Sequence, residues 1–377
     1  MLLWFGSLHL FTTDTTRGIV NTTLVYYRAA SASASFEFVR LAVCCSSGDQ
    51  SGRDHRASLW APMPSYDPKA QLWHLFYVQY SSTANNASGW YSNFDGQIAH
   101  AVSSVPGPAG IGGPYTDRGV VLKPDEHSQN WEGLQGTDSI SPPFVLPDGR
   151  RWAAFYGSAE TQIPASHQRP HIWWNGLAIA QSLGGKFVRV TPSSLVNFNG
   201  GGSENPVVTF IPKHKLYVAV FDDLHDEANG FGLSWSADGL TWATPAARVL
   251  VPGGTRTPMA SILEEDGETL SVYYTTGAPE RIWHGRFRLH LNNTVDVPRA
   301  GASGEAPEAE EDAVRVRVKH DDTSGSGAGV LLTAGWLAQA WCVDIARGDE
   351  DLFTYEEITY SSPDEYDEEH DKYDGDP

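Results

Sequence analysis

The sequence predicts an all-β protein, a five-bladed β-propeller, because one short pattern of residues recurs five times along the chain. In most copies an aromatic-rich apolar segment follows a clear turn such as Pro147-Asp148-Gly149, which is typical of a tight β-hairpin. A period of several tens of residues built from short strands is typical of propellers, whose blades close into a ring and leave few exposed edges. The copies lie at residues 8–11, 73–77, 152–156, 216–220 and 270–274.

Each repeat continues into a second half that predicts two further strands, so the predicted blade has four. In the fourth repeat this half is 230–242, an apolar strand followed by the turn Ser236-Ala237-Asp238-Gly239 and the start of another strand. The 37 glycines, 23 prolines and 13 tryptophans of the 377-residue chain suit a protein of many turns better than a helical one. The predicted blades span residues 1 to 41, 59 to 115, 138 to 190, 204 to 244 and 255 to 291.

Beyond the predicted propeller domain at 1–295, the sequence changes character three times. Residues 296–329 are rich in acidic residues around Pro307 and predict a linker, and residues 330–347 predict a short helix. The apolar run inside that helix is shorter than the about 20 residues that a membrane-spanning helix needs, so a membrane span is the weaker interpretation. Residues 348–377 contain thirteen acidic residues and one lysine, which predicts an acidic, disordered tail.

Charge and cysteine content exclude some classes of function. More than half of the formal net charge of −20 lies in the acidic tail, and no basic face is available for phosphates, so nucleic acid is excluded as a partner. The scattered histidines form no metal-ligand motif, and neither a metal nor a cofactor is predicted from the residues. Cys44, Cys45 and Cys342 show neither a disulfide framework nor a metal-binding spacing. We expect a monomer.

The N-terminal residues and the glycosylation sequons bear on the location of the protein. The N-terminus lacks a basic segment and a small-residue cleavage site, so no signal peptide is recognisable in the sequence. We expect an extracellular or secretory location all the same, where three N-glycosylation sequons would permit glycosylation. They begin at Asn21, Asn86 and Asn292.

Two carboxylates stand where the innermost strands of neighbouring blades are predicted to begin. Asp138 opens the third blade and Glu204 opens the fourth, and in a propeller these strand starts converge around the central channel. Glycoside hydrolysis needs two carboxyl groups that flank the scissile bond, one protonated and one ionised. The alternative is that both are turn residues that bind backbone amides, as Asp often does.

Several motifs in this order resemble glycoside hydrolase family 43 and its arabinanase, levansucrase and invertase superfamily. They are Trp60-Ala61-Pro62, Asp138 ahead of the hairpin at 148–152, and Ser203-Glu204-Asn205-Pro206, and the resemblance covers roughly residues 1 to 290. It implies that Glu204 is the general acid and that Asp138 raises the pKa of that acid. It also allows a structural calcium ion in the channel.

The family's general base, an Asp that opens the first blade, has no counterpart at the expected position. Counting back six to eight residues from Trp4 places it before Met1, so the sequence is predicted to begin inside the first inner strand. The alternative is that the base has been lost. Asp14, after the second strand of the first blade, and Asp54, in the loop that enters the second, are candidate substitute bases, although both also suit loop-capping or surface carboxylates.

Aromatic and basic residues near the strand starts are candidate sugar contacts. Trp60 and Trp174 could stack on the apolar face of a sugar ring, although Trp also fills space between blades. His127 and Arg256 are candidate pocket residues. Arg256 opens the fifth blade and would bind a substrate hydroxyl or pair with Glu204.

The predicted function is therefore hydrolysis of a furanosyl or related linkage in an oligo- or polysaccharide, by inversion if the protein follows the family. Two alternatives stay open. One is an inactive propeller that binds glycans, and the other is a retaining, fructan-active enzyme of the same superfamily.

Overall fold

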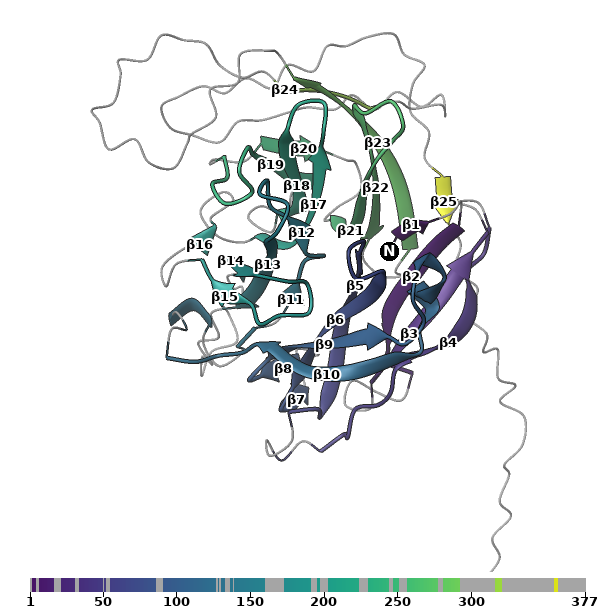
Figure 1. Cartoon of the computed structure of the whole chain (residues 1–377), viewed down its shortest axis with the longest axis vertical. Helices are drawn as coiled ribbons and strands as arrows, with labels where there is room; N and C mark the ends of the chain where they lie inside the picture. The colour runs from purple at the N-terminus through teal and green to yellow at the C-terminus, as the bar shows by residue number, and fades with distance from the viewer. Residues whose placement is uncertain are drawn as a thin grey trace, which may run out of the picture.

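A computed structural model shows an all-β protein, as the sequence predicts (Figure 1). Its only helices in the described part are two short 3-10 turns, η1 at Pro108–Gly112 and η2 at Asn130–Glu132. The structure describes residues 2–4, 7–16, 22–30, 34–49, 51, 55–85, 91–126, 128, 130–132, 136–137, 139–159, 173–190, 195–196, 203–223, 230–243, 247–250, 256–276, 281–291, 316–320 and 356–358.

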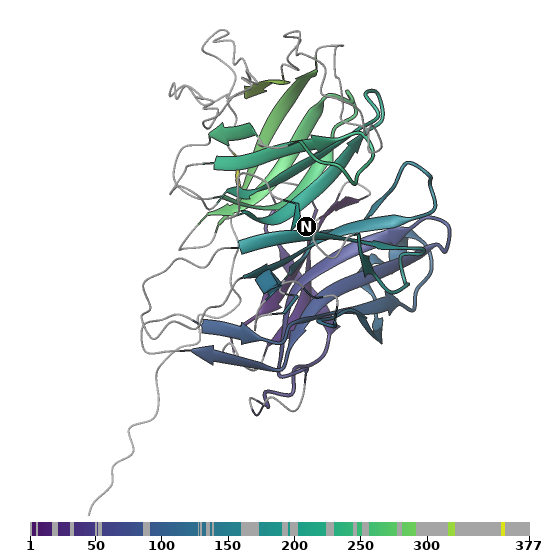
Figure 2. The same ribbon diagram turned by 90° about the vertical axis from the view of Figure 1, so that its left-hand side faces the viewer.

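Five antiparallel sheets of four or more strands follow one another along these described residues. The first contains β1 (Leu2–Trp4), β2 (Ser7–Asp14), β3 (Thr23–Ala29) and β4 (Glu37–Val43). The second contains β5 (Ser58–Asp67), β6 (Leu72–Tyr80), β9 (Gln97–Ser103) and β10 (Tyr115–Leu122), with the hairpin β7 (Ser82–Asn85) and β8 (Tyr91–Phe94) inserted after β6. This hairpin stands out from one side of the molecule (Figure 2).

The remaining three sheets follow the same plan. The third contains β11 (Ser139–Ile140), β12 (Phe144–Val145), β13 (Trp152–Ala159), β14 (Trp173–Ala180), β15 (Val188–Arg189) and β16 (Leu195–Val196). The fourth contains β17 (Ser203–Ile211), β18 (Leu216–Asp223), β19 (Gly230–Ser236) and β20 (Ala247–Leu250). The fifth contains β21 (Arg256–Leu263), β22 (Thr269–Thr276), β23 (Arg281–Leu291), β24 (Val316–His320) and β25 (Glu356–Ile358). All five repeated segments form the second strand of their sheet, which confirms them as strands.

Five buried apolar clusters lie between successive sheets and hold them together. One cluster joins the first sheet to the second, and three more join each later sheet to the next. In the last cluster Leu8 and Leu10 of the first sheet pack against Ala260 and Tyr273 of the fifth. The packing therefore returns to its starting point, and the first strands β5, β11, β17 and β21 lie nearest the middle of the molecule (Figure 1). Burial of apolar surface on both faces of each sheet is the main stabilising term of such an arrangement.

The C-terminal third of the chain contributes strands to the fifth sheet. Strand β24 pairs with β23 and lies within the segment for which the sequence predicts a linker, and β25 pairs with β23 from within the predicted acidic tail. The predicted helix at 330–347 lies outside the described residues. Within the described ranges no helix is long and apolar enough to cross a membrane. Cys44 and Cys45 are joined in a disulfide, for which the sequence showed no framework.

A buried pair of histidines lies where the second sheet meets the third. His74 Nδ1 and His100 Nε2 are 2.7 Å apart and share one hydrogen, while Gly184 of the third sheet lies against both rings. Because one ring must accept this bond, at least that ring is neutral. Burial, with the second ring as a further cause, lowers the pKa of His100 to about 3, and burial lowers that of His74.

This pair is expected to make the fold sensitive to acid. Between pH 6.5 and about 3 the unfolded chain binds a proton at His100 that the folded chain does not, so the free energy of unfolding falls as pH falls through that window. At pH 4.5 the loss from His100 alone is about 3 kcal/mol. Urea unfolding at pH 7 and at pH 4.5 measures this change in unfolding free energy. The comparison protein is His100→Gln, whose side chain at that position does not titrate. An equal loss in the variant would remove His100 as the cause.

Candidate active site

The candidate site lies at one end of the sheets, where the first strands begin and the second strands end. We call this end the rim. Four cross-strand pairs occupy equivalent places there. In each pair the residue on the second strand lies six positions after the first residue of that strand to pair across the hairpin turn. These first residues are Leu72, Arg151, Leu216 and Thr269. The pairs are Trp60 with Val78, Ser139 with Gly157, Glu204 with Asp222, and Thr257 with Thr275.

The two side chains of such a pair face each other on the same side of the sheet. The third sheet shows this directly, because a Cβ added at Gly157 would stand 2.3 Å from the Ser139 hydroxyl. In the fourth sheet the corresponding partners are two carboxylates, Glu204 and Asp222. Glu204 is half-buried, whereas Asp222 is 2% exposed.

A β-bulge follows directly after Glu204 and sets the direction of its side chain. The register of β17 against β18 shifts between Glu204 and Val207, and Asn205 inside the bulge has φ +50°. Asn is one of the few residues that adopt this left-handed conformation at modest cost. The second sheet repeats the device, because a bulge follows Trp60 and Ala61 also has φ +50°. Bulges are used next to active sites to re-aim a side chain.

Both chain neighbours of Glu204 are held by buried side chains. Ahead of it, Asn175 of β14 donates from Nδ2 to the Ser203 carbonyl at 2.8 Å and to the Ser203 hydroxyl at 3.0 Å. After it, Asn205 Nδ2 donates to Asp222 Oδ2 at 3.2 Å. That same oxygen accepts from the Thr257 hydroxyl of β21 at 3.1 Å. The backbone around Glu204 is therefore fixed by groups from the third, fourth and fifth sheets.

The tryptophans predicted to bind sugar are both at the rim. Trp60 begins the bulge of β5, is half-buried, and donates from Nε1 to the Ser58 hydroxyl at 2.5 Å. Trp174 lies in β14 directly before Asn175, and its buried Nε1 has no hydrogen-bond partner in the described structure. Trp60, whose N–H is already bonded, can offer its ring face to a ligand. Trp174 can offer its ring face and also its N–H as a hydrogen-bond donor.

The other predicted site residues are described only in part. Arg256 is the first residue of β21 and its backbone pairs with Thr276, but its side chain lies outside the described structure. Asp138, His127 and Asp54 also lie outside the described residues. Asp14 ends β2 at the rim, where its Oδ1 accepts the backbone N–H of Thr16 at 2.9 Å, a loop-capping contact.

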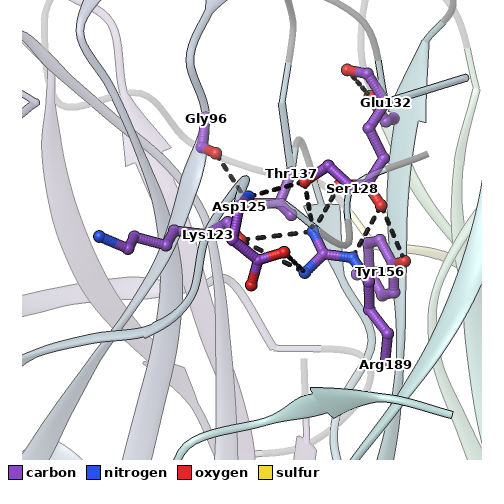
Figure 3. Close-up of polar contacts among 9 residues, drawn as sticks. Gly96, Lys123, Asp125, Ser128, Glu132, Thr137, Tyr156 and Arg189 are labelled. Atoms are coloured by element: carbon purple, nitrogen blue, oxygen red, sulfur yellow. Dashed lines mark hydrogen bonds and ion pairs between the residues drawn. The ribbon is translucent and has the colours of Figure 1, made fainter. Parts of the chain in front are cut away.

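A buried ion pair anchors the segment that leads into the third sheet (Figure 3). Glu132 of η2 binds Arg189 of β15 through both carboxylate oxygens, at 2.8 and 2.5 Å, and the two side chains are 2% and 5% exposed. Tyr156 donates to the same carboxylate, and burial together with this neighbouring charge raises the pKa of its phenol. The guanidinium also binds the Lys123 carbonyl and Ser128. Glu132 is thereby held against β13 and β15.

Sequence reasoning missed Asp222, Asn175, Glu132 and Arg189. Counting from the hairpin turn would have paired Asp222 with Asn205, because the bulge adds one residue to β17 and shifts the register to Glu204. The other contacts join residues 28 to 57 positions apart and leave no local pattern. No group of three or more His, Cys, Asp or Glu in the described ranges could hold a metal. The calcium ion that the resemblance allows stays a prediction, because calcium also binds backbone and amide carbonyls.

Solved structures with a similar fold are glycoside hydrolases. No protein-family model matches the sequence, and a search of curated proteins returned no match. An exo-β-1,3-galactanase from Phanerochaete chrysosporium with bound β-1,3-galactotriose is 12% identical at a TM-score of 0.50, covering 76% of this chain and 58% of the galactanase.

Two further solved structures are similar at lower TM-scores. A family 117 glycoside hydrolase from Zobellia galactanivorans is 15% identical, with a TM-score of 0.44, and 64% of this chain matches 66% of it. An endo-1,5-α-L-arabinanase from Thermotoga petrophila is 11% identical, with a TM-score of 0.48, and the match covers 78% and 71% of the two chains. At such identities the likeness concerns the fold alone, and this chain shares its fold with the galactanase.

Proposed function

We propose that the protein is a glycoside hydrolase in which Glu204 is the general acid. The observation that carries the proposal is the placement of Glu204. It begins an inner strand at the rim, its chain neighbours on both sides are anchored by buried side chains, and a bulge directs it. General acids must be held within hydrogen-bond reach of the leaving oxygen, and such precision needs rigid support.

We infer further that the five sheets are the blades of one propeller and that the rim opens on its central channel. The closed series of apolar clusters supports this. Asp138 would act there as the carboxylate that raises the pKa of the acid by like-charge repulsion. Trp60 and Trp174 would stack on sugar rings, and Arg256 and His127 would bind hydroxyls.

The proposed substrate is a furanosyl or related plant or microbial polysaccharide, cleaved with inversion. Inversion requires a water between the acid and a second carboxylate about 6.5 to 9.5 Å away. Two of the solved structures named above are a β-1,3-galactanase and a 1,5-α-L-arabinanase, which suggests the first glycans to test. Such polymers are extracellular, so we propose a secreted, monomeric enzyme whose sequons at Asn21, Asn86 and Asn292 carry glycans.

Incubation of the protein with α-1,5-arabinan, β-1,3-galactan and fructan oligosaccharides tests the proposal, with products followed by proton NMR. We expect release of a sugar whose anomeric configuration is initially the opposite of that in the substrate. Initial retention on fructan would favour the alternative of a retaining, fructan-active enzyme.

A glycan-binding protein without catalysis is the second candidate. It is favoured by Asp14, the described substitute base, because its Oδ1 is engaged in a loop cap. Saturable binding of one of these oligosaccharides without any product would support this candidate and contradict the hydrolase.

A further inference from the structure

Asp222 is a buried carboxylate at a place where the fold does not require one. It is 2% exposed, and a buried charge is costly unless hydrogen bonds or an opposite charge compensate it. The equivalent residues in the other sheets are Val78, Gly157 and Thr275, none of which ionises. The second strand can therefore pass this point without a carboxylate. Among the described pairs, the carboxylate on the second strand occurs only in the fourth sheet, where the residue opposite it on the first strand is Glu204.

The hydrogen bonds of Asp222 lead to the bulge behind Glu204. Its Oδ2 accepts from Asn205 inside the bulge and from Thr257 on the neighbouring first strand. Ala61 adopts the same φ of +50° in the second sheet although alanine has no side chain to hydrogen-bond. The bond from Asn205 to Asp222 is therefore not needed to form the bulge. What it adds is a fixed orientation of the bulge relative to β18 and to the fifth sheet.

We propose that Asp222 is a positioning residue that holds Glu204 in its working direction, a role that rests on the proposed function for its catalytic consequence. Asp222 fixes the residue after Glu204, and Asn175 fixes the residue before it. With the backbone fixed on both sides, the Cα–Cβ bond of Glu204 keeps one direction and the set of rotamers open to its side chain is restricted. Misplacement of a catalytic group by about 1 Å can cost on the order of 100-fold in rate. Asp222 itself takes no part in bond making or breaking.

The test compares Asp222→Ala with Asp222→Asn, in which the amide oxygen still accepts the bonds from Asn205 and Thr257. The matched control is Val218→Ala, which removes a buried side chain from the same strand, away from the rim. On a glycan that the wild type cleaves, Asp222→Ala should lower kcat by about 10- to 100-fold and change KM less than twofold. Asp222→Asn should restore kcat to within a few-fold. Val218→Ala should lower Tm by several degrees with kcat unchanged.

A second readout needs no substrate. In protein labelled with ¹³C at the Glu carboxyl carbons, the Glu204 signal is the one missing from Glu204→Gln. We expect one sharp Glu204 signal in the wild type, in Asp222→Asn and in Val218→Ala, and a broadened or split signal in Asp222→Ala. If the wild type cleaves no glycan but the signal responds in this way, positioning stands and the proposed function fails. If Asp222→Ala keeps the wild-type kcat, or leaves the Glu204 signal unchanged, the positioning role is overturned.

Discussion

Glu204→Gln is expected to lower kcat by about 10²- to 10⁴-fold on any glycan that the wild type cleaves. The amide has the size of the carboxyl group and hydrogen-bonds in its place, but it cannot deliver a proton to the leaving oxygen. Substrate binding and the fold should persist, because Ser203 and Asn205 keep their anchors on Asn175 and Asp222. Initial rates and binding isotherms on the same oligosaccharide separate the two effects.

The matched control for this substitution is Glu265→Gln. Glu265 is exposed in the turn between β21 and β22, at the end of the fifth sheet opposite the rim, so the same chemical change there should leave kcat as in the wild type. If Glu204→Gln also kept its activity, Glu204 would have no place in the mechanism. Loss of oligosaccharide binding with loss of the fold would instead show a structural role.

Arg189→Leu is expected to cost about 3 to 5 kcal/mol of unfolding free energy, because it leaves the carboxylate of Glu132 buried without its cation. Arg189 supplies two buried hydrogen bonds to that carboxylate and further, partly buried ones to the Lys123 carbonyl and Ser128. Urea denaturation at pH 7 measures the loss. Folding at 25 °C could fail outright, since such a loss is a large part of the stability of an ordinary domain.

The double variant Glu132→Leu/Arg189→Leu keeps the result interpretable. It removes both charges together, and replacement of a complete buried pair by apolar groups is often close to neutral. We therefore expect the double variant to recover at least half of the stability that Arg189→Leu loses. A single variant that loses less than about 1 kcal/mol would contradict the role of the pair as an anchor.

This anchor links stability to the candidate site. Glu132 also accepts the Ser158 hydroxyl at its backbone carbonyl, and Ser158 belongs to the rim end of β13. Thr137, at the end of the anchored segment, binds the Gly96 carbonyl through both its N–H and its hydroxyl (Figure 3). The segment is thus tied to the second and third sheets immediately before Asp138 in the chain.

The repeated second strands could be predicted because their signal is local. A turn and an aromatic-rich apolar run lie within about a dozen residues, as in the segment from Asp148 to Tyr156, so one sequence is enough to recognise them. The third strands were recognised in the same way. Glu204 could be singled out because it opens the fourth repeat in the position where Asp138 opens the third.

The parts that the sequence did not predict depend on contacts between distant residues. The Glu132–Arg189 pair spans 57 positions and has no periodic pattern, and Asn175 reaches Ser203 only because the third and fourth sheets pack together. Strand β24 lies in a segment of polar composition that predicts a linker, and it is held by pairing with β23 along its backbone. Val314, Val316 and Val318 alternate with Arg or Lys, a local pattern typical of a strand, which an interpretation based on the acidic composition of the wider segment overlooks.

The most direct test of Glu204 as the general acid is to measure how the rate of the Glu204→Gln variant depends on the pKa of the leaving group. Aryl glycosides of the sugar that the oligosaccharide panel identifies, with phenols of decreasing pKa, need progressively less protonation to depart. The account predicts that Glu204→Gln is severely slowed on poor leaving groups and approaches the wild-type rate on the best. An equal loss on every leaving group would contradict the assignment of Glu204 as the proton donor.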